Sequence, residues 1–259
     1  MVAADANVPV VQVDRGVDVA GYNADLLVYC RGGRLAVDLQ APVLVVGLEA
    51  GAGGWTVVTA AGTWRARTVV NAAGAWADAV AVMAGAAPCG MRSMRRTALI
   101  VDLPPGMDAA AWPMVIDTDE TFYFKPEGGR LLLSPADETP MAPCDVQPDE
   151  LDIAVCVDRV QQAADLPVRR VVRSWAGLRS FAADRTPVVG FDPAVPGLFW
   201  LAGQGGYGIQ TAPAMGHLAA ALLAGEGVPQ DLQALGVSAA SLAPGRPGLR
   251  PANADSAWV

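Results

Sequence analysis

The chain has 259 residues, of which 53% are hydrophobic and only 17% charged, and its formal net charge is −8. This acidic balance argues against a nucleic-acid-binding protein, because there is no basic stripe to neutralise phosphates. No window approaches the roughly 18 uninterrupted apolar residues of a membrane helix, and the N-terminus lacks the pattern of a signal peptide. Neither an integral membrane segment nor a signal peptide is predicted.

The number and spacing of the cysteines and the histidine limit which disulfides and metal sites the chain could form. Cys30, Cys89, Cys144 and Cys156 are widely separated and form no C-x-x-C pair. Scattered thiols favour reduced cysteines in a cytoplasmic protein, with disulfides as the alternative. The only histidine, His217, falls inside the last predicted helix. One histidine without a cysteine cluster argues against zinc, and no metal site is predicted.

The first part of the chain predicts one helix followed by an antiparallel meander. The helix covers residues 19–32 and ends at glycines, which are common helix stops. Apolar runs predict strands over 43–48, 55–60 and 63–70, with the glycine-rich stretch 51–54 as a turn. Because a strand follows this stretch, it is a hairpin turn and not a phosphate loop.

The third strand leads into VVNAAGAWAD at residues 69–78, and a helix is predicted to about residue 86. The small residues Ala72, Ala73 and Gly74 would let a flat molecule approach the backbone at the helix start. Tight packing of helix against sheet explains the same residues, and at this stage both interpretations stay open.

The middle of the chain predicts a sheet. A strand is expected over 91–102, and others over 114–117, 121–126 and 130–134, followed by a Pro- and acid-rich loop over 135–149 and a helix over 150–165. Arg96 stands at the head of an apolar run, where an unpaired guanidinium would be costly, so a ligand carboxylate is a suitable partner. The alternative is that the arginines of this sheet lie on the protein surface and bind no ligand.

A glycine loop near the C-terminus organises the rest. The apolar run 198–202 predicts a buried strand, and a helix is expected to begin near Thr211 or Pro213. Strand, glycine loop and helix start together form backbone N–H groups at the positive end of a helix, which suits an anion. A glycine turn that only lets helix and strand pack closely is the alternative. The last 25 or so residues are predicted to be a poorly ordered tail.

Gly203, Gly205 and Gly208 spell G-x-G-x-x-G, which alone is weak evidence for a dinucleotide site. A Rossmann fingerprint needs a further strand and an acidic residue about 20 positions on. Neither follows here, so the segment is interpreted as a last strand and last helix.

Several long motifs resemble a known family: VVNAAGAWAD, RRTA, FYFKPEGG, SPADETP, SWAGLRSFAADRTPVVGFD and FWLAGQGGYGIQTAPA. Over roughly residues 40–225 they are similar to the D-amino-acid oxidase-like FAD-dependent oxidoreductases, and within them to the bacterial D-arginine dehydrogenases. The resemblance implies FAD as cofactor. It also implies oxidation of an amino acid, with D-amino acids expected, to an imino acid that water hydrolyses to a 2-oxo acid.

The resemblance also implies site residues. Arg96 and Arg179 would hold the substrate carboxylate, Tyr123 would add a hydroxyl contact, and the Gly206 carbonyl would accept from the amine, while Met114 and Ile116 would line the side-chain pocket. Val45 would pack on the adenine end, and Ala73 and Gly74 would lie close to the cofactor. The flavin would be wrapped by Gly203, Gln204, Gly205, Gly206, Tyr207, Gly208, Ile209 and Gln210. No catalytic side chain is assigned.

The expected fold is mixed α/β, a partial FAD-binding fold with an inserted antiparallel substrate sheet. Its segments are a flavin part over 14–90 and 175–225, a substrate sheet domain over 91–174, and a tail over 226–259. Family members begin with a strand–G-x-G-x-x-G–helix unit that this sequence does not show. The alternatives are therefore an inactive remnant, or one subunit of a split flavoenzyme whose partner chain supplies that unit. A carboxylate-binding module without redox chemistry is a further alternative.

Overall fold

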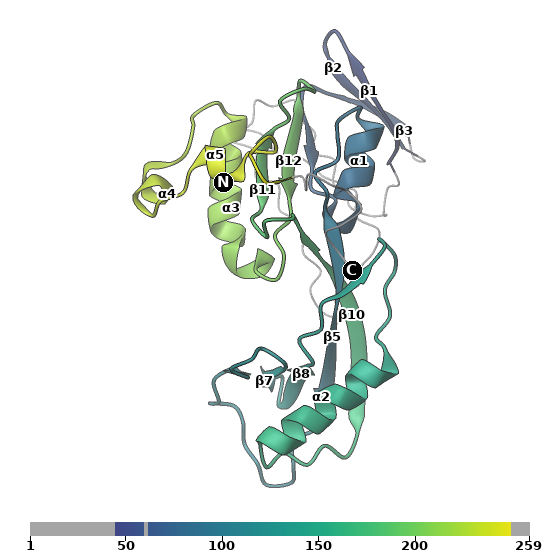
Figure 1. The fold of residues 1–259 in the computed structure, drawn as a ribbon, viewed down its shortest axis with the longest axis vertical. Coiled ribbons are helices and arrows are strands. Elements are labelled where there is room, and N and C mark those ends of the chain that lie inside the picture. The colour runs from purple at the N-terminus through teal and green to yellow at the C-terminus, as the bar shows by residue number, and fades with distance from the viewer. Residues whose placement is uncertain (1–44, 60–61, 250–259) are drawn as a thin grey trace. The chain divides into compact units, whose positions relative to one another are not determined.

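The computed structural model describes residues 45–59 and 62–249, and the helix expected over 19–32 lies outside them. The described chain is mixed α/β with three sheets, as Figure 1 shows. It divides into two compact units, one made of residues up to Arg92 together with those from Arg179 onward, the other of Ser93–Leu178. The sequence placed these divisions after residues 90 and 174.

The first unit begins with a meander. β1 (Val45–Gly51), β2 (Gly54–Thr59) and β3 (Gly62–Ala66) form an antiparallel sheet, in which Gly51 pairs with Gly54 across a tight turn. This confirms the predicted hairpin. The single strand expected over 63–70 is wrong, because the chain leaves the meander after β3. It resumes as β4 (Val69–Asn71), in which all three residues are buried within another sheet.

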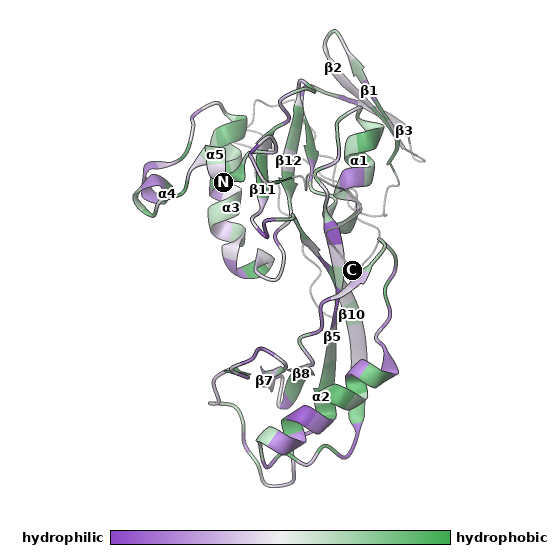
Figure 2. Cartoon of the chain, viewed as in Figure 1, coloured by the Kyte–Doolittle hydropathy of each residue, from purple (hydrophilic) through white to green (hydrophobic). Residues whose placement is uncertain are grey.

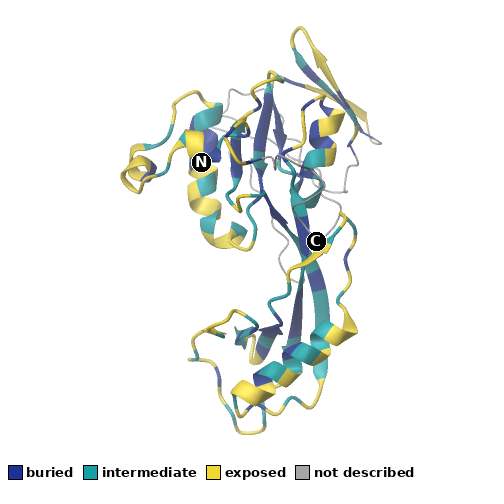
Figure 3. Cartoon of the chain, viewed as in Figure 1, coloured by how far each residue is buried: buried dark blue, intermediate teal, exposed yellow. Residues whose placement is uncertain are grey.

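That second sheet carries the core of the first unit. β12 (Leu198–Ala202) lies between β11 (Val188–Phe191), which it pairs antiparallel, and β4, which it pairs parallel. Strand side chains alternate between faces. Leu198 and Trp200 belong to the apolar cluster that includes α1 (Ala77–Met83), and Phe199 belongs to the cluster of α3 (Gly208–Leu223). The sheet is therefore covered by a helix on each face, and β12 is dark blue over most of its length in Figure 3.

The beginning of α3 and the end of the chain correct two predictions. α3 begins at Gly208, so Pro213 lies inside the helix and not in its first turn. The predicted poor order of the last 25 or so residues is wrong for 235–249, which include α5 (Ala239–Leu242); α4 (Gln230–Ala234) comes just before them. Leu232 and Leu242 are buried in the cluster of α3. The abundance of Ala, Pro and Gly concealed these few apolar anchors.

The second unit is a sheet covered by a helix. Its strands run in the order β10 (Val171–Phe181), β5 (Arg92–Val101), β8 (Arg130–Ser134), β7 (Tyr123–Glu127), β6 (Val115–Ile116), and β9 (Thr139–Met141) pairs with β5. β9 lies within the stretch predicted as a loop, which is a further correction. The unit boundaries fall inside β5 and β10.

The helix α2 (Glu150–Ala163) buries one stripe on this sheet. Cys156 and Val160 join Leu99 and Leu133 in the apolar cluster, and Figure 2 shows apolar and polar residues alternating along the helix. Burial raises the pKa of the Cys156 thiol to about 12. This thiol therefore stays protonated and acts as an apolar side chain.

Candidate functional site

The glycine loop of the first unit lies against the end of β10. The Gly205 amide donates to the Ser180 carbonyl over 2.9 Å. A Cβ added at Gly205, where φ is +56°, would lie 2.5 Å from the Phe181 ring. At Gly206 it would lie 2.9 Å from Arg179 Nη1. At Gly205 only glycine permits this approach, so the backbone of the loop rests directly on Phe181. At Gly206 the added Cβ would meet only the end of the flexible Arg179 side chain, so here the loop lies beside the guanidinium without requiring glycine.

The N-terminus of α3 follows this loop without a capping side chain. Its N-cap residue, Tyr207, makes no side-chain cap, and the first turn holds no acidic residue. Gly206, Tyr207, Ile209 and Gln210 are exposed, Ile209 by 79%. The first-turn amides of a helix have no partner within it and carry partial positive charge. The residues present therefore fit a flat group with an electron-rich edge, such as a flavin ring.

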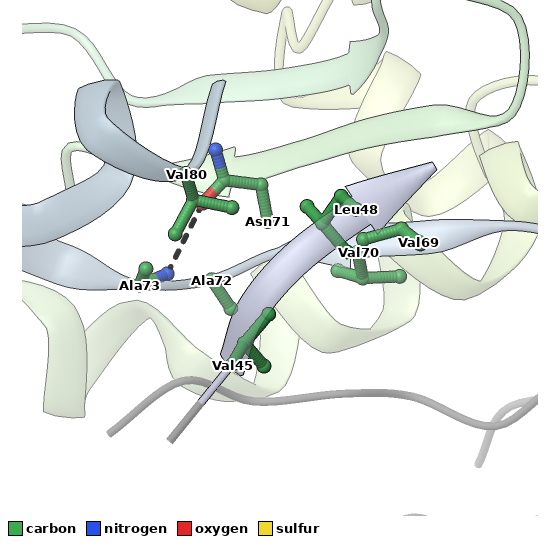
Figure 4. Close-up of a pocket in the computed structure, with 8 residues that line it drawn as sticks. All are labelled: Val45, Leu48, Val69, Val70, Asn71, Ala72, Ala73 and Val80. Atoms are coloured by element: carbon green, nitrogen blue, oxygen red, sulfur yellow. Dashed lines mark hydrogen bonds between the residues drawn. The ribbon is translucent and has the colours of Figure 1, made fainter. Parts of the chain in front are cut away.

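A second glycine turn follows β4. The buried Asn71 donates from Nδ2 to the Ala77 carbonyl over 2.8 Å and accepts from the Ala73 amide over 3.4 Å. It thereby fixes the turn through Gly74, whose φ is +54°. An apolar pocket opens beside this turn, shown in Figure 4, and it is lined by Val45, Leu48, Val69, Val70, Asn71, Ala72, Ala73 and Val80. The predicted cofactor residues Val45 and Ala73 are thus brought together.

Four predicted substrate residues lie in the second unit. On adjacent strands, Ile116 pairs with Tyr123. Met114 and Ile116 are exposed by 48% and 55%. Arg96 lies on β5 and already has partners, because its Nε donates to the Asp137 carbonyl over 2.7 Å and its Nη2 pairs with the Glu138 carboxylate at 3.2 Å. A substrate carboxylate at Arg96 would have to share this guanidinium with Glu138.

The predicted site residues thus fall into two groups, one in each unit. The first unit brings together Arg179, Gly206 and the rest of the glycine loop, and separately Val45 and Ala73. The second holds Arg96, Tyr123, Met114 and Ile116.

Sequence reasoning missed three residues that shape the loop: Phe181 beneath Gly205, Met91 against Gly203, and Asp78. Asp78 holds Met91 in place, because its carboxylate accepts from the amides of Cys89 and Met91 over 2.8 and 2.7 Å. The D at the end of VVNAAGAWAD was the one signal that could have found it.

Two negative findings concern the described residues alone. Among them no group of three or more His, Cys, Asp or Glu side chains is arranged to hold a metal ion. None of the helices between residues 45 and 249 combines the length and apolar character needed to cross a bilayer.

Known proteins share both sequence and fold with this chain. A Xenopus laevis protein named FAD-dependent oxidoreductase domain-containing protein 1 is 32% identical over 183 residues, covering 64% of this chain and 34% of that protein. Glycine oxidase from Geobacillus kaustophilus superposes with a TM-score of 0.63 at 26% identity, over 73% of this chain and 50% of the oxidase. The chain therefore spans a third to a half of these relatives.

The fold recurs at lower identity, and the family match is long. L-amino acid deaminase from Proteus vulgaris has a TM-score of 0.64 at 16% identity, over 79% of this chain and 57% of the deaminase, which shows a shared fold. Residues 17–222 match the family described as FAD dependent oxidoreductase, DAO. FAD is the cofactor that defines this family, and the uncapped α3 N-terminus beside the glycine loop fits it. The chain belongs to the DAO family of FAD-dependent oxidoreductases.

Proposed function

We propose that the chain is part of an oxidoreductase that oxidises an amino acid, a D-amino acid first of all, to the imino acid and hence the 2-oxo acid. The observation that carries this proposal is the glycine loop at the uncapped start of α3, with Arg179 beside Gly206. The likeness to a glycine oxidase supports an amino-acid substrate. The motif resemblance to D-arginine dehydrogenases supports the D series.

When bound, FAD would supply the hydride acceptor. The chain would hold it with the backbone of the α3 start, whose partial positive charge favours added electron density on the flavin. The exposed side chains of Tyr207 and Ile209 offer apolar surface to the ring system. The proposed cofactor residues are Val45, Ala73, Gly74, Gly203, Gln204, Gly205, Gly206, Tyr207, Gly208, Ile209 and Gln210.

The chain's own part in catalysis is to bind and orient the substrate. Arg179 would pair with the carboxylate, because a guanidinium offers two parallel donors. The Gly206 carbonyl would accept from the amine and so orient the Cα hydrogen. Arg96 and Tyr123 would add contacts, with Arg96 exchanging Glu138 for the substrate. Met114 and Ile116 would contact the side chain. We propose no side-chain base, since an amine that arrives neutral needs none.

As a second candidate we propose that a partner chain completes the flavin site with a strand–G-x-G-x-x-G–helix unit. This proposal is motivated by the chain's coverage of 50% of the glycine oxidase. We place the protein in the cytoplasm, since Cys89, Cys144 and Cys156 are free thiols in the described structure, as a reducing compartment predicts.

The test is the visible spectrum of the purified chain after incubation with FAD and desalting. We expect retained flavin absorbance that bleaches anaerobically with D-arginine or another D-amino acid and less with the L-isomer. A colourless chain that gains flavin only with a partner would support the second candidate. A chain that retains FAD but is bleached by no amino acid would contradict the proposed substrate class.

Arg179→Ala is the first variant to measure. It should raise KM for the amino acid roughly tenfold or more with a smaller change in kcat, because a charged hydrogen-bond partner of the carboxylate is lost. Lys125→Ala, which removes an exposed cation paired with Glu127, is the control. An unchanged KM in Arg179→Ala would remove Arg179 from the substrate site.

A further inference from the structure

Arg246, in the segment after α5, has an unusually complete set of partners. Its side chain is 5% exposed, and it forms a fork with Asp184, from Nε to Oδ2 over 2.7 Å and from Nη2 to Oδ1 over 2.9 Å. Nη2 also donates to the Thr186 carbonyl over 2.7 Å. Nη1 donates to the carbonyls of Pro187 and Leu242, each over 3.0 Å. One buried guanidinium therefore ties the end of α5 to the turn at residues 184–187.

This turn continues the segment on which the glycine loop rests. Arg185 has φ of +58°, donates its amide to the Ala182 carbonyl over 2.9 Å, and places its guanidinium 4.2 Å from the centre of the Phe181 ring. The Phe181 ring lies beneath Gly205, whose amide is held by Ser180. The contacts thus run without a break from Arg246 through Asp184, Arg185 and Phe181 to Gly205.

The strain and burial along this path require a strong anchor. A bulky residue at positive φ, such as Arg185, is unfavourable and persists only where its surroundings hold it. A buried guanidinium supplies such an anchor, since breaking one of its charged pairs leaves the other charge without its partner. The carbonyls of Thr186 and Pro187 lose their donor in the same step.

We propose that Arg246 is a positioning residue for the glycine loop: by fixing the 184–187 turn it keeps Arg185 on Phe181 and Phe181 beneath Gly205. The consequence for flavin rests on the proposed function, whereas the effect on the loop does not. The hydrogen bonds of Arg246 in the described structure go to the 184–187 turn and to the end of α5 and not to the loop, so its effect on the loop is expected to pass through the turn.

The decisive measurement is amide hydrogen exchange at Gly205 in the full chain, without flavin. Arg246→Met should speed this exchange roughly tenfold or more, because the loop loses its support. Arg246→Lys, which keeps the charge but not the fork, should give an intermediate rate. Equal Gly205 exchange in wild type and Arg246→Met would overturn the proposal, even if the segment around α5 loosens.

Leu249→Ala is the matched control. Leu249 is 1% exposed and belongs to the apolar cluster of α1 and β12, so its truncation destabilises the same unit and leaves the atoms of the Arg246–Asp184 fork unchanged. Its amide donates to the Arg246 carbonyl over 3.4 Å, a backbone contact that alanine keeps. We expect it to leave Gly205 exchange within about twofold of wild type at conditions of equal global stability. If it accelerates Gly205 as much as Arg246→Met does, the loop responds to general destabilisation and the proposal fails.

Two further measurements cover the case in which Arg246→Met does not fold and the case in which the chain binds no FAD. If Arg246→Met does not fold, Asp184→Asn and Arg246→Lys decide by the same criterion, since each weakens the fork without leaving a cavity. FAD affinity is measured in parallel by quenching of flavin fluorescence. It should be highest in wild type, lower in Arg246→Lys and lowest in Arg246→Met. A wild-type chain that binds no FAD counts against the proposed function, while the exchange data still judge Arg246.

Discussion

The two long helices begin in opposite ways. α2 starts at Asp149, whose carboxylate accepts from the Leu151 amide over 2.9 Å, and its first turn carries Glu150 and Asp152. α3 starts at Tyr207 with no side-chain cap and no acid in its first turn. The first arrangement satisfies a helix end internally, as a structural helix requires. The second leaves amides and partial positive charge for a group outside the helix, which is why we propose that the flavin binds at α3 and not at α2.

Among the variants that test whether the flavin binds at the start of α3, Gly205→Ala should have the largest effect on FAD retention. The new Cβ would meet the Phe181 ring at 2.5 Å and force a side chain into positive φ. Together these cost about 2–5 kcal/mol. We expect FAD retention to be lost while the second unit stays folded, which desalting followed by absorbance and circular dichroism would measure.

Gly206→Ala sharpens that result. Its Cβ would meet only the end of the flexible Arg179 side chain, so FAD should be retained and the amino-acid affinity should fall instead. Equal loss of FAD in both variants would show that the Phe181 contact has no special role.

Asp149→Ala tests the other helix. Loss of the N-cap should lower the free energy of unfolding by about 1 kcal/mol, measured by urea titration, with no change in FAD affinity. Asp149 also lies 3.7 Å from Arg95, so Asp149→Asn, which keeps the cap and removes the charge, separates the two contributions. Weaker FAD binding in either variant would contradict the proposal that the flavin binds at the start of α3 and not at that of α2.

Gln210→Glu places an acidic residue in the first turn of α3, where α2 already carries acidic residues. An acid in the exposed first turn should stabilise the chain without flavin by about 0.3–1 kcal/mol and weaken FAD binding by a similar amount. Thermal unfolding and flavin fluorescence report the two effects. Stabilisation of both forms alike would mean that the α3 N-terminus does not face the flavin.

Acid should weaken the Arg246–Asp184 fork that supports the loop. Hydrogen bonding from Arg246 lowers the pKa of Asp184 from its ordinary value of 3.8. A carboxyl group with a lowered folded pKa stabilises the fold above its ordinary value, and this contribution is lost as pH falls through the folded pKa. Below pH 3.8, Asp184→Asn should therefore show a shallower loss of stability than wild type in acid titrations followed by circular dichroism.

The sequence predicted those elements whose signal is local. The apolar run 198–202 became β12 with the same bounds, and the acid-capped α2 began where expected. β10 was not recognised as a strand, because the SWAGLRSF run mixes small, polar and aromatic residues and its 11-residue length depends on pairing with β5. The break between β3 and β4 depends likewise on β12, which lies far along the chain.

In the candidate site too, local features could be predicted from the sequence, whereas features that depend on tertiary structure could not. The glycine loop could be located from its residues, since glycines at such spacing are a local feature. The partners could not be predicted, because Phe181, Glu138 and Arg246 meet Gly205, Arg96 and Asp184 only through tertiary structure. The roles of individual residues in binding stay predictions for the variants above.

The parallel pairing of β4 with β12 has a consequence for how the protein folds. Val70 on β4 pairs with Phe199 on β12, and the whole second unit, Ser93–Leu178, lies between them in the chain. Contacts of such separation form slowly, because a long loop must close first. During synthesis the second unit is complete before β12 has been made. We therefore expect the second unit to fold early, and the central sheet of the first unit to form only after β12 has been made, because β4 has no partner in that sheet until then.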